Sequence, residues 1–187
     1  KDVPRDYDGK YLGRMTVRTA LGGSRNIPAI KAYYLAGEEE KVLDFLDKIG
    51  LISLRKFKES FNQKALERGW TFDYGWPMAI GSGEVKLLDL VGAYTVFANG
   101  GNYYPLNPLL EVRNRKGEII EDFYKPEGKQ VIDPQVAYII NDMLSDIAAR
   151  PQGSWRSLLT IPGHNVAAKT GTSNKKIGRT LLPNNDL

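Results

Sequence analysis

The sequence of 187 residues contains no cysteine and only one histidine, His164. The lack of cysteine fits a protein outside the cytoplasm that has no disulfides, although it does not exclude other compartments. A single histidine excludes a metal site built from several histidines. The acidic residues show no metal-ligand spacing such as that of an EF-hand loop. The sequence therefore predicts no metal site.

Long apolar runs are also missing, since no stretch approaches the roughly 20 residues that a membrane-spanning helix needs. The first residues do not have the pattern of a signal peptide. The net charge of +4 is mild, and no basic stripe alternates with aromatic residues, so nucleic acid is not expected as a partner. Hydrophobic content of 42% and charged content of 26% are ordinary for one soluble globular domain.

Two short motifs carry the chemical information. Ser24-Arg25-Asn26 matches S-x-N, and Lys169-Thr170-Gly171 matches K-T-G. With S-x-x-K, these form the motif set of active-site serine acyl-transferases that act on D-alanyl peptides and β-lactams. Given this composition, about half an S-x-N and about a fifteenth of a K-T-G are expected by chance. The motifs need support from their surroundings.

The surroundings supply that support. Residues 8–21 (DGKYLGRMTVRTAL), which run into Ser24 and Asn26, resemble the transpeptidase domain of class A penicillin-binding proteins. So do residues 79–85 (AIGSGEV), 93–101 and 168–172, in the family's order. The resemblance implies an α/β (α+β) penicillin-binding and serine β-lactamase-like fold, with an antiparallel sheet packed by helices and a helical subdomain. One departure is Lys86-Leu87, where the family usually has Thr/Ser-Pro.

The first motif is expected between two helices. Residues 15–21 suit one or two helical turns that Gly22-Gly23 would stop, and Pro28 suits the first position of the next helix. Ser24 and Asn26 would then lie in the tight connection. Such a loop can hold polar side chains rigidly towards a cleft.

Further along, periodicity predicts several helices and one hairpin. A helix beginning at Glu38 would bury Val42, Phe45, Leu46 and Ile49, and a short helix would carry Leu54, Phe57 and Phe61. Residues 69–83 read as a long loop, and residues 85–98 as a helix with Leu88, Val91, Thr95 and Ala98 on one face. Residues 110–114 and 118–123 predict a β-hairpin. Asp133-Pro134 opens a helix to about Ala149, and residues 166–169 predict a strand.

The resemblance also assigns catalytic roles. It implies that Ser24 relays a proton to the leaving amine and that Lys169 lies near Ser24, where its charge shapes that relay and attracts the substrate carboxylate. Asn26 would hydrogen-bond the acyl side of the substrate or the region of the nucleophile. The simpler alternatives are that Ser24 only caps the following helix, and that Lys169 is an ordinary edge-strand lysine.

The remaining site residues would bind substrate. The resemblance implies that the hydroxyls of Thr170 and Thr172 hold the substrate carboxylate, and that the backbone N–H of Thr172 forms half of an oxyanion hole. Gly171 has no side chain, so a substrate or a neighbouring backbone could approach closely. The free backbone of an edge strand could align a peptide as an additional strand.

The family's nucleophile is missing from its usual place, because no serine precedes Ser24. Ser53 with Lys56 and Ser173 with Lys176 match S-x-x-K, but both pairs follow S-x-N. We interpret the first pair as a solvated helix face, and the second runs directly off K-T-G. Ser60-Phe61-Asn62 also matches S-x-N, with Phe61 better explained as core.

The expected domain is therefore residues 1–187 as part of one transpeptidase domain, cut at both ends, with Asp186 at the start of a further strand. It would not turn over substrate alone. The resemblance implies a parent protein on the extracytoplasmic face of the bacterial cytoplasmic membrane, with a membrane anchor and a glycosyltransferase domain. Its partners would be peptidoglycan stem peptides and β-lactams, without metal or organic cofactor. The alternatives are a non-catalytic binding module and a D,D-carboxypeptidase or β-lactamase relative.

Overall fold

The computed structural model describes residues 3–123, 126–171, 176–177 and 180–181. Thr172 and Asp186, to which the sequence assigned an oxyanion donor and a further strand, lie outside the described residues. The helices are α1 (Val17–Gly22), α2 (Asn26–Leu35), α3 (Glu38–Lys48), α4 (Ser53–Ala65), α5 (Leu87–Ala98), α6 (Pro134–Ser145) and α7 (Ser154–Leu158), with 3-10 turns η1 (Leu66–Arg68), η2 (Trp76–Ile80) and η3 (Ile147–Ala149). The strands are β1 (Asn102–Tyr103), β2 (Glu111–Arg113), β3 (Ile119–Asp122), β4 (Lys129–Gln130), β5 (Lys176–Ile177) and β6 (Thr180–Leu181).

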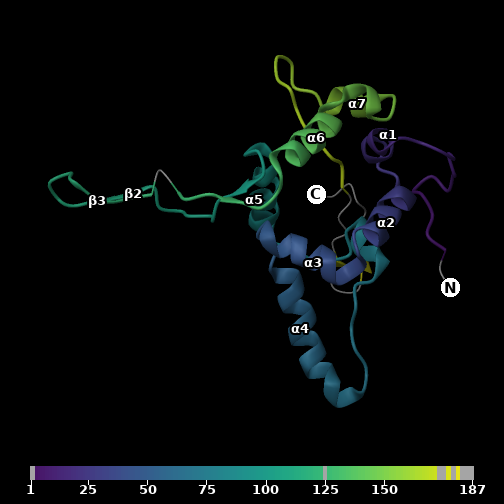
Figure 1. Cartoon of the computed structure of the whole chain (residues 1–187), viewed down its shortest axis with the longest axis horizontal. Helices are drawn as coiled ribbons and strands as arrows, with labels where there is room; N and C mark the ends of the chain where they lie inside the picture. The colour runs from purple at the N-terminus through teal and green to yellow at the C-terminus, as the bar shows by residue number, and fades with distance from the viewer. Residues whose placement is uncertain (1–2, 124–125, 172–175, 178–179, 182–187) are drawn as a thin grey trace.

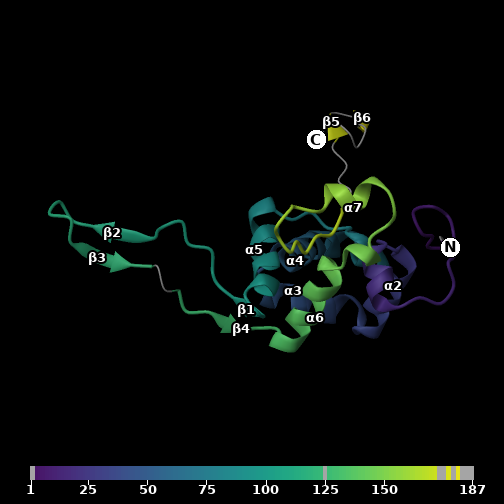
Figure 2. The same ribbon diagram turned by 90° about the horizontal axis from the view of Figure 1, so that it is seen from above.

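Most helices gather in one body from which two parts project. In Figure 1, α4 extends from the end of α3, and the hairpin β2–β3 reaches out beyond α5. Figure 2 shows the same hairpin standing clear of the helices. Helix α6 packs against both α1 and α5, although its sequence lies far from that of α1. This packing brings residues 17–22 and 134–145 together.

The strands form three separate antiparallel pairs among the described residues, β1–β4, β2–β3 and β5–β6. This mixture of helices and antiparallel strands agrees with the predicted α+β class. The predicted hairpin is confirmed, with Glu111 opposite Asp122 and an irregularity between Val112 and Arg113.

The strand predicted at residues 166–169 is wrong, because residues 165–171 pair with no strand in the described part of the chain. The Ala168 N–H instead bonds to the carbonyl of Leu144 at the end of α6, at 3.2 Å. A strand is defined by the backbone of its neighbour. Here the neighbour is a helix end, so no ladder forms.

Most helices were predicted, but α7 was not, and the helix expected from Pro134 to about Ala149 ends at Ser145 because the backbone of Asp146 is extended. The buried faces of two helices also differ from the prediction. Phe45 is exposed and Leu43 is fully buried, whereas the predicted α3 stripe contained Phe45 and omitted Leu43. In α5, Leu88 and Val91 are 64% and 54% exposed, while Ala93 and Val96 are buried. The small side chain of Ala93 permits close approach of neighbouring elements, so here packing outweighs side-chain hydrophobicity.

The core joins α3, α5, α6 and the β1–β4 pair. Its buried residues are Ile49, Leu51, Ala93, Val96, Ile132 and Ala137. Gly101 lets the chain turn into this core, because its φ of +89° lies in the left-handed region and an added Cβ would overlap the carbonyl oxygen of Ile132. Asp133 caps α6 as predicted, since its carboxylate accepts the N–H of Gln135 at 2.8 Å.

None of the helices in the described ranges is long and apolar enough to cross a bilayer. The same part of the chain contains no cluster of acidic, histidine or cysteine side chains that could hold a metal ion.

Candidate active site

Ser24 and Lys169 are 145 residues apart in the sequence and in direct contact in the structure. The Lys169 ammonium donates a hydrogen bond to Ser24 Oγ at 2.7 Å. It also donates to the carbonyl of Thr170 at 2.8 Å, and Thr170 Oγ1 lies 3.5 Å away. The fold therefore brings S-x-N and K-T-G together, as their joint presence in the sequence suggested.

The turn that carries Ser24 has a defined backbone geometry. After α1 ends, the Ser24 N–H bonds to the Leu21 carbonyl at 3.1 Å and the Arg25 N–H to the Ala20 carbonyl at 3.0 Å. This pair of bonds is the Schellman motif, whose residue after the cap usually is glycine. Here that residue is Ser24, with φ +52°. A non-glycine residue in this region is strained, and such strain clusters at functional sites.

Arg25 anchors the turn to the preceding segment. Its buried guanidinium lies 3.0 Å from the carboxylate of Asp6 and 2.9 Å from that of Asp8, and it donates to the Lys10 carbonyl at 2.8 Å. Tyr7 places its ring 5.2 Å from the same guanidinium. The hydrogen bond from Arg25 holds the pKa of Asp8 at about 2. The middle residue of S-x-N, to which the sequence analysis gave no role, thus fixes the motif in place.

Asn26 lies on the first turn of α2, not in the loop where it was predicted. Its side-chain amide donates to the carbonyl of Arg5 at 3.0 Å. The first N–H groups of a helix have no partner within the helix, and here the Ile27 N–H bonds to the Asp6 carboxylate at 3.2 Å. The described cap of α2 is therefore the Asp6 carboxylate, and no side-chain bond from Ser24 caps the helix, which argues against the simpler interpretation of Ser24.

Lys169 is half-buried, and this burial lowers the pKa of its ammonium below the ordinary value of 10.5. Desolvation disfavours the charged form, so the proton is released more readily than from a lysine in water. A lysine with a lowered pKa and the hydroxyl that it contacts form a pair that can transfer a proton. A lysine that only protects a strand edge from aggregation would instead remain solvated.

Gly171 is exposed, and a Cβ added there would meet no described atom within 4 Å. Its backbone is not in the left-handed region either. The fold as described therefore does not require glycine at this position. A requirement for glycine would have to come from groups other than the described residues. Thr170 beside it is half-buried and holds the Lys169 ammonium through its carbonyl.

A family model described as the penicillin-binding protein transpeptidase domain matches residues 2–180. The chain belongs to this family.

Relatives among curated proteins agree. The chain is similar to penicillin-binding protein 1A/1B of Bacillus subtilis, at 32% identity over 171 residues that cover 91% of this chain and 17% of that protein. It is also similar to penicillin-binding protein 1A of Neisseria flavescens, at 28% identity over 175 residues, 91% of this chain and 20% of that protein. The chain thus spans 17–20% of the length of these relatives.

Solved structures show the same fold. Penicillin-binding protein 1A of Haemophilus influenzae superposes with a TM-score of 0.68 at 22% identity, over 91% of this chain and 28% of that one. Penicillin-binding protein 3 of Mycobacterium tuberculosis, complexed with ampicillin, gives a TM-score of 0.69 at 20% identity, over 92% of this chain and 40% of that one. The predicted transpeptidase fold is confirmed.

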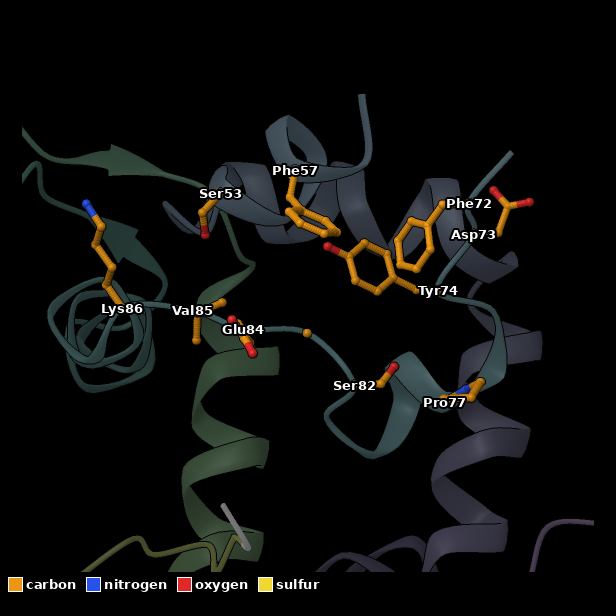
Figure 3. A pocket seen from close by; sticks show the side chains of 11 residues that line it. Ser53, Phe57, Phe72, Asp73, Tyr74, Pro77, Ser82, Glu84, Val85 and Lys86 are labelled. Atoms are coloured by element: carbon orange, nitrogen blue, oxygen red, sulfur yellow. The ribbon is translucent and has the colours of Figure 1, made fainter. Parts of the chain in front are cut away.

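A pocket of about 800 Å³ lies apart from this family site, between the start of α4 and residues 72–86. Figure 3 shows Phe57, Phe72 and Tyr74 along one side of it, with Ser53 above the chain at Val85. Ser53 Oγ is buried and has no hydrogen-bond partner in the described part of the chain, whereas Lys56 is exposed. Ser53 and Lys56 therefore do not form one solvated face, and no described bond joins them as a catalytic pair.

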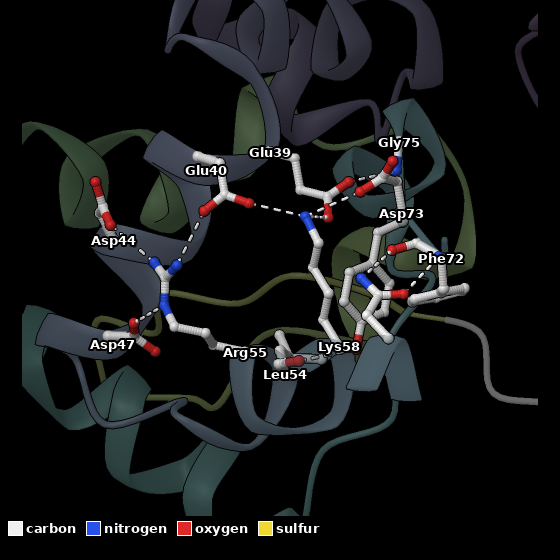
Figure 4. A network of polar contacts seen from close by, with 12 residues as sticks. Glu39, Glu40, Asp44, Asp47, Leu54, Arg55, Lys58, Phe72, Asp73 and Gly75 are labelled. Atoms are coloured by element: carbon white, nitrogen blue, oxygen red, sulfur yellow. Dashed lines mark hydrogen bonds and ion pairs between the residues drawn. The ribbon is translucent and has the colours of Figure 1, made fainter. Parts of the chain in front are cut away.

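A charged network ties α4 to the body, and the sequence analysis missed it (Figure 4). Lys58 lies 2.8 Å from both Glu39 and Glu40 and 3.0 Å from Asp73. Burial acts to lower the pKa of Lys58, but its hydrogen bonds to these carboxylates outweigh burial and raise it. Glu39 also accepts the N–H of Gly75 at 2.7 Å. The sequence contains no local signal for this network, because its members come from three separate segments.

Proposed function

We propose that this chain supplies the S-x-N and K-T-G parts of a serine D,D-transpeptidase that cross-links peptidoglycan stem peptides ending in D-Ala-D-Ala. The observation that carries the proposal is the 2.7 Å contact between Lys169 Nζ and Ser24 Oγ. It joins the two motifs of the serine acyl-transferase set in a turn that places Ser24 in a strained conformation. Membership of the transpeptidase family supports the same reaction class.

The proposed reaction begins when a serine hydroxyl attacks the carbonyl between the two D-alanines. The C–N bond breaks, an acyl-enzyme forms and D-alanine leaves. The lysine of the nucleophile's own S-x-x-K motif would accept the proton of the attacking hydroxyl, while the leaving amine gains a proton from Ser24, which recovers one from Lys169. An amine of a second stem peptide then attacks the ester and gives up a proton to the neutral Lys169 through Ser24. The C–O bond breaks, and the serine is released and recovers its own proton. The lowered pKa of Lys169 supports this role, because a group transfers protons most efficiently when its pKa lies near the pH at which the enzyme works.

Substrate binding is assigned to the K-T-G side. The hydroxyls of Thr170 and Thr172 would hold the terminal carboxylate beside the Lys169 ammonium. The N–H of Thr172 would stabilise the oxyanion, a contribution of about 3–4 kcal/mol to the barrier when such a donor is lost. Space beside Gly171 supports approach of an extended peptide. Asn26 would face the acyl side of the substrate, and this requires its amide to exchange the Arg5 carbonyl for the substrate.

The attacking serine would come from an S-x-x-K motif outside these 187 residues, since none precedes Ser24 in the sequence. We further propose that the parent protein carries a membrane anchor and a glycosyltransferase domain and lies at the extracytoplasmic face of the bacterial cell envelope. Its partners would be stem peptides and β-lactams. The named relatives, penicillin-binding proteins of the 1A type, support this assignment.

The test is intact-mass spectrometry after incubation with a penicillin. It compares the 187-residue chain with the natural protein extended upstream by a domain's length. We expect only the extended form to gain one drug mass, on a serine upstream of Lys1. Acylation of the short chain on Ser24 or Ser53 would overturn the assignment of the nucleophile. Absence of acylation in both forms would favour a binding module without catalysis.

A water-accepting enzyme of the same motif set is separated by its products. With a D-Ala-D-Ala peptide and an added amine, a transpeptidase forms the cross-linked amide, whereas a D,D-carboxypeptidase releases only the hydrolysed acid. A β-lactamase would instead turn over the penicillin, and the added drug mass would disappear with time.

A further inference from the structure

Arg150 is a buried cation, and the proposed reaction gives it no role. Its residue is 4% exposed. The guanidinium donates to the carbonyls of Leu159 at 2.7 Å, Leu144 at 3.1 Å and Val166 at 2.7 Å. Within the described residues no carboxylate pairs with it. A buried charge that is balanced only by carbonyl dipoles costs desolvation free energy that an apolar side chain would not.

The three carbonyls belong to different segments of the chain, so the buried guanidinium connects these segments. Leu144 lies in the last turn of α6, where carbonyls have no partner within the helix. Leu159 follows α7, and Val166 stands three residues before Lys169. One nitrogen, Nη2, bonds both Leu144 and Val166. The planar guanidinium, whose five N–H donors are fixed in a fork, reaches all three carbonyls at once.

The same region also holds the Ser24 side of the site. A Cβ on Gly22, in the last turn of α1, would lie 2.6 Å from the carbonyl oxygen of Ala149, the residue before Arg150. Arg18 of α1 forms ion pairs with Asp142 and Asp146 at the end of α6. The end of α6 and the η3 turn therefore contact both halves of the site, and Figure 1 shows α6 and α7 beside α1.

We propose that Arg150 is a positioning residue for the acyl-transfer site, which sets the Lys169–Ser24 contact by clamping residues 159–166 to the end of α6. The segment that carries Lys169 has no strand partner in the described part of the chain. Besides the guanidinium, one backbone bond ties it to this region, from the Ala168 N–H to the same Leu144 carbonyl. Without the clamp, the segment would lose two of the contacts that align it, and the Lys169 ammonium would move from Ser24 into solvent. The expected loss of acylation rests on the proposed function, whereas the expected displacement of Lys169 from Ser24 does not.

The test uses Arg150→Met, Arg150→Lys and the control Arg113→Met, all in the natural protein that carries this chain. Arg113 is a suitable control because it also donates to a backbone carbonyl, that of Gly117, but in the projecting hairpin. The first readout is the pKa of Lys169, measured by competitive acetylation of lysines across pH and peptide mass spectrometry. The second is the rate of acylation by a penicillin across pH, well below the unfolding temperature of each variant.

We expect the Lys169 pKa to rise towards 10.5 in Arg150→Met, since the ammonium becomes solvated, and to remain unchanged in Arg113→Met. The acylation rate should fall roughly 100-fold in Arg150→Met, a loss typical of a reacting group displaced by about 1 Å, with its pH profile shifted to match. Arg150→Lys keeps the charge but reaches fewer carbonyls, so it should fall between wild type and Arg150→Met. This variant decides the question if Arg150→Met does not fold.

A folded Arg150→Met or Arg150→Lys with unchanged Lys169 titration would overturn the proposal and leave Arg150 a structural residue. An unacylated wild type would overturn the proposed function alone, because the Lys169 titration does not depend on acylation. A rate loss without any change of the Lys169 pKa or of the pH profile would also contradict the positioning role.

Discussion

The two sides of the candidate site are held in different ways. Ser24 lies in a turn whose bonds are mostly local, and Arg25 fixes that turn through two carboxylates. Among the described residues, Lys169 lies on a segment without a strand partner, and a buried arginine whose described bonds go only to carbonyls holds this segment. The first side therefore depends on compensated charge and strained backbone, and the second on a few long-range contacts. Changes to the residues that support each side, rather than to Ser24 and Lys169 themselves, should affect the first side mainly through stability and the second mainly through activity.

The largest effect is expected from breaking the contact between the two sides. Lys169→Met and Ser24→Ala should each lower the rate of acylation by a penicillin about 10²- to 10⁴-fold, the range of lost proton transfer. Because the two groups act as one unit, the double variant should be little slower than either single variant. The measurement is a double-mutant cycle on acylation rates. Strictly multiplicative losses would show that the two residues act independently.

Arg25→Met should have the largest effect on stability. It leaves the buried carboxylate of Asp6 without its cation, and breaking a buried pair in this way typically costs about 3–5 kcal/mol of unfolding free energy. Urea unfolding measures this loss, with Arg113→Met as the control that removes an exposed arginine. A change below about 1 kcal/mol would mean that the Ser24 side does not depend on the ion pairs.

Gly22 and Gly171 differ in their surroundings. A Cβ added at Gly22 would meet another part of the fold, whereas one added at Gly171 would meet no described atom within 4 Å. Gly22→Ala should destabilise by about 1–3 kcal/mol because the new Cβ meets the Ala149 carbonyl oxygen at 2.6 Å. Gly171→Ala should change the unfolding free energy by less than about 0.5 kcal/mol, yet slow acylation. Thermal unfolding and acylation rates measured on both variants test this. A destabilising Gly171→Ala with normal acylation would remove the argument for ligand approach there.

The strain at Ser24 predicts a smaller difference between two ways of removing its hydroxyl. Ser24→Gly should be about 1 kcal/mol more stable than Ser24→Ala, because glycine adopts a φ of +52° without a Cβ penalty. Both should lose acylation to the same extent. Urea unfolding of the pair gives the difference, and equal stability would argue that the turn relaxes around alanine.

The smallest effects concern pH. The hydrogen bond from Arg25 lowers the pKa of Asp8 from 3.8 to about 2 in the folded state. The stabilisation from Asp8 should therefore be complete above about pH 3.8 and be lost as the pH falls towards about 2. Lys169 acts at the other end. Burial lowers its pKa in the folded state, so the unfolded chain binds more protons between that value and 10.5, and stability should rise with pH over this interval.

Unfolding free energies across pH test both, with Asp8→Asn and Lys169→Met. The first variant should lose the acid dependence and the second the alkaline rise. An alkaline rise that persists in Lys169→Met would have to come from another group.

Much of this protein follows from its sequence alone. The helices around residues 17–22, 38–48 and 134–145, the cap at Asp133 and the hairpin at residues 111–122 rest on local signals, because caps, turns and periodicity act within a few residues. S-x-N and K-T-G pointed to the family only together with the stretches around them, residues 8–21, 79–85 and 93–101, because each triplet alone is short enough to occur by chance. The catalytic roles of Ser24, Asn26 and Lys169 stay predictions. So do the substrate-binding roles of Thr170, Gly171 and Thr172, the last of which lies outside the described residues.

Only the tertiary structure decided which faces are buried and what holds the site. Leu88 and Val91 are exposed while Ala93 is buried, because close packing of α5 selects small residues that hydrophobicity alone does not. No local pattern in the sequence assigned a role to Arg25 or Arg150, yet both are buried. Their partners lie 15 to 19 residues away for Arg25 and come from three segments for Arg150. Contacts of this kind carry no local pattern, because a buried charge is defined by the groups that the whole fold brings to it.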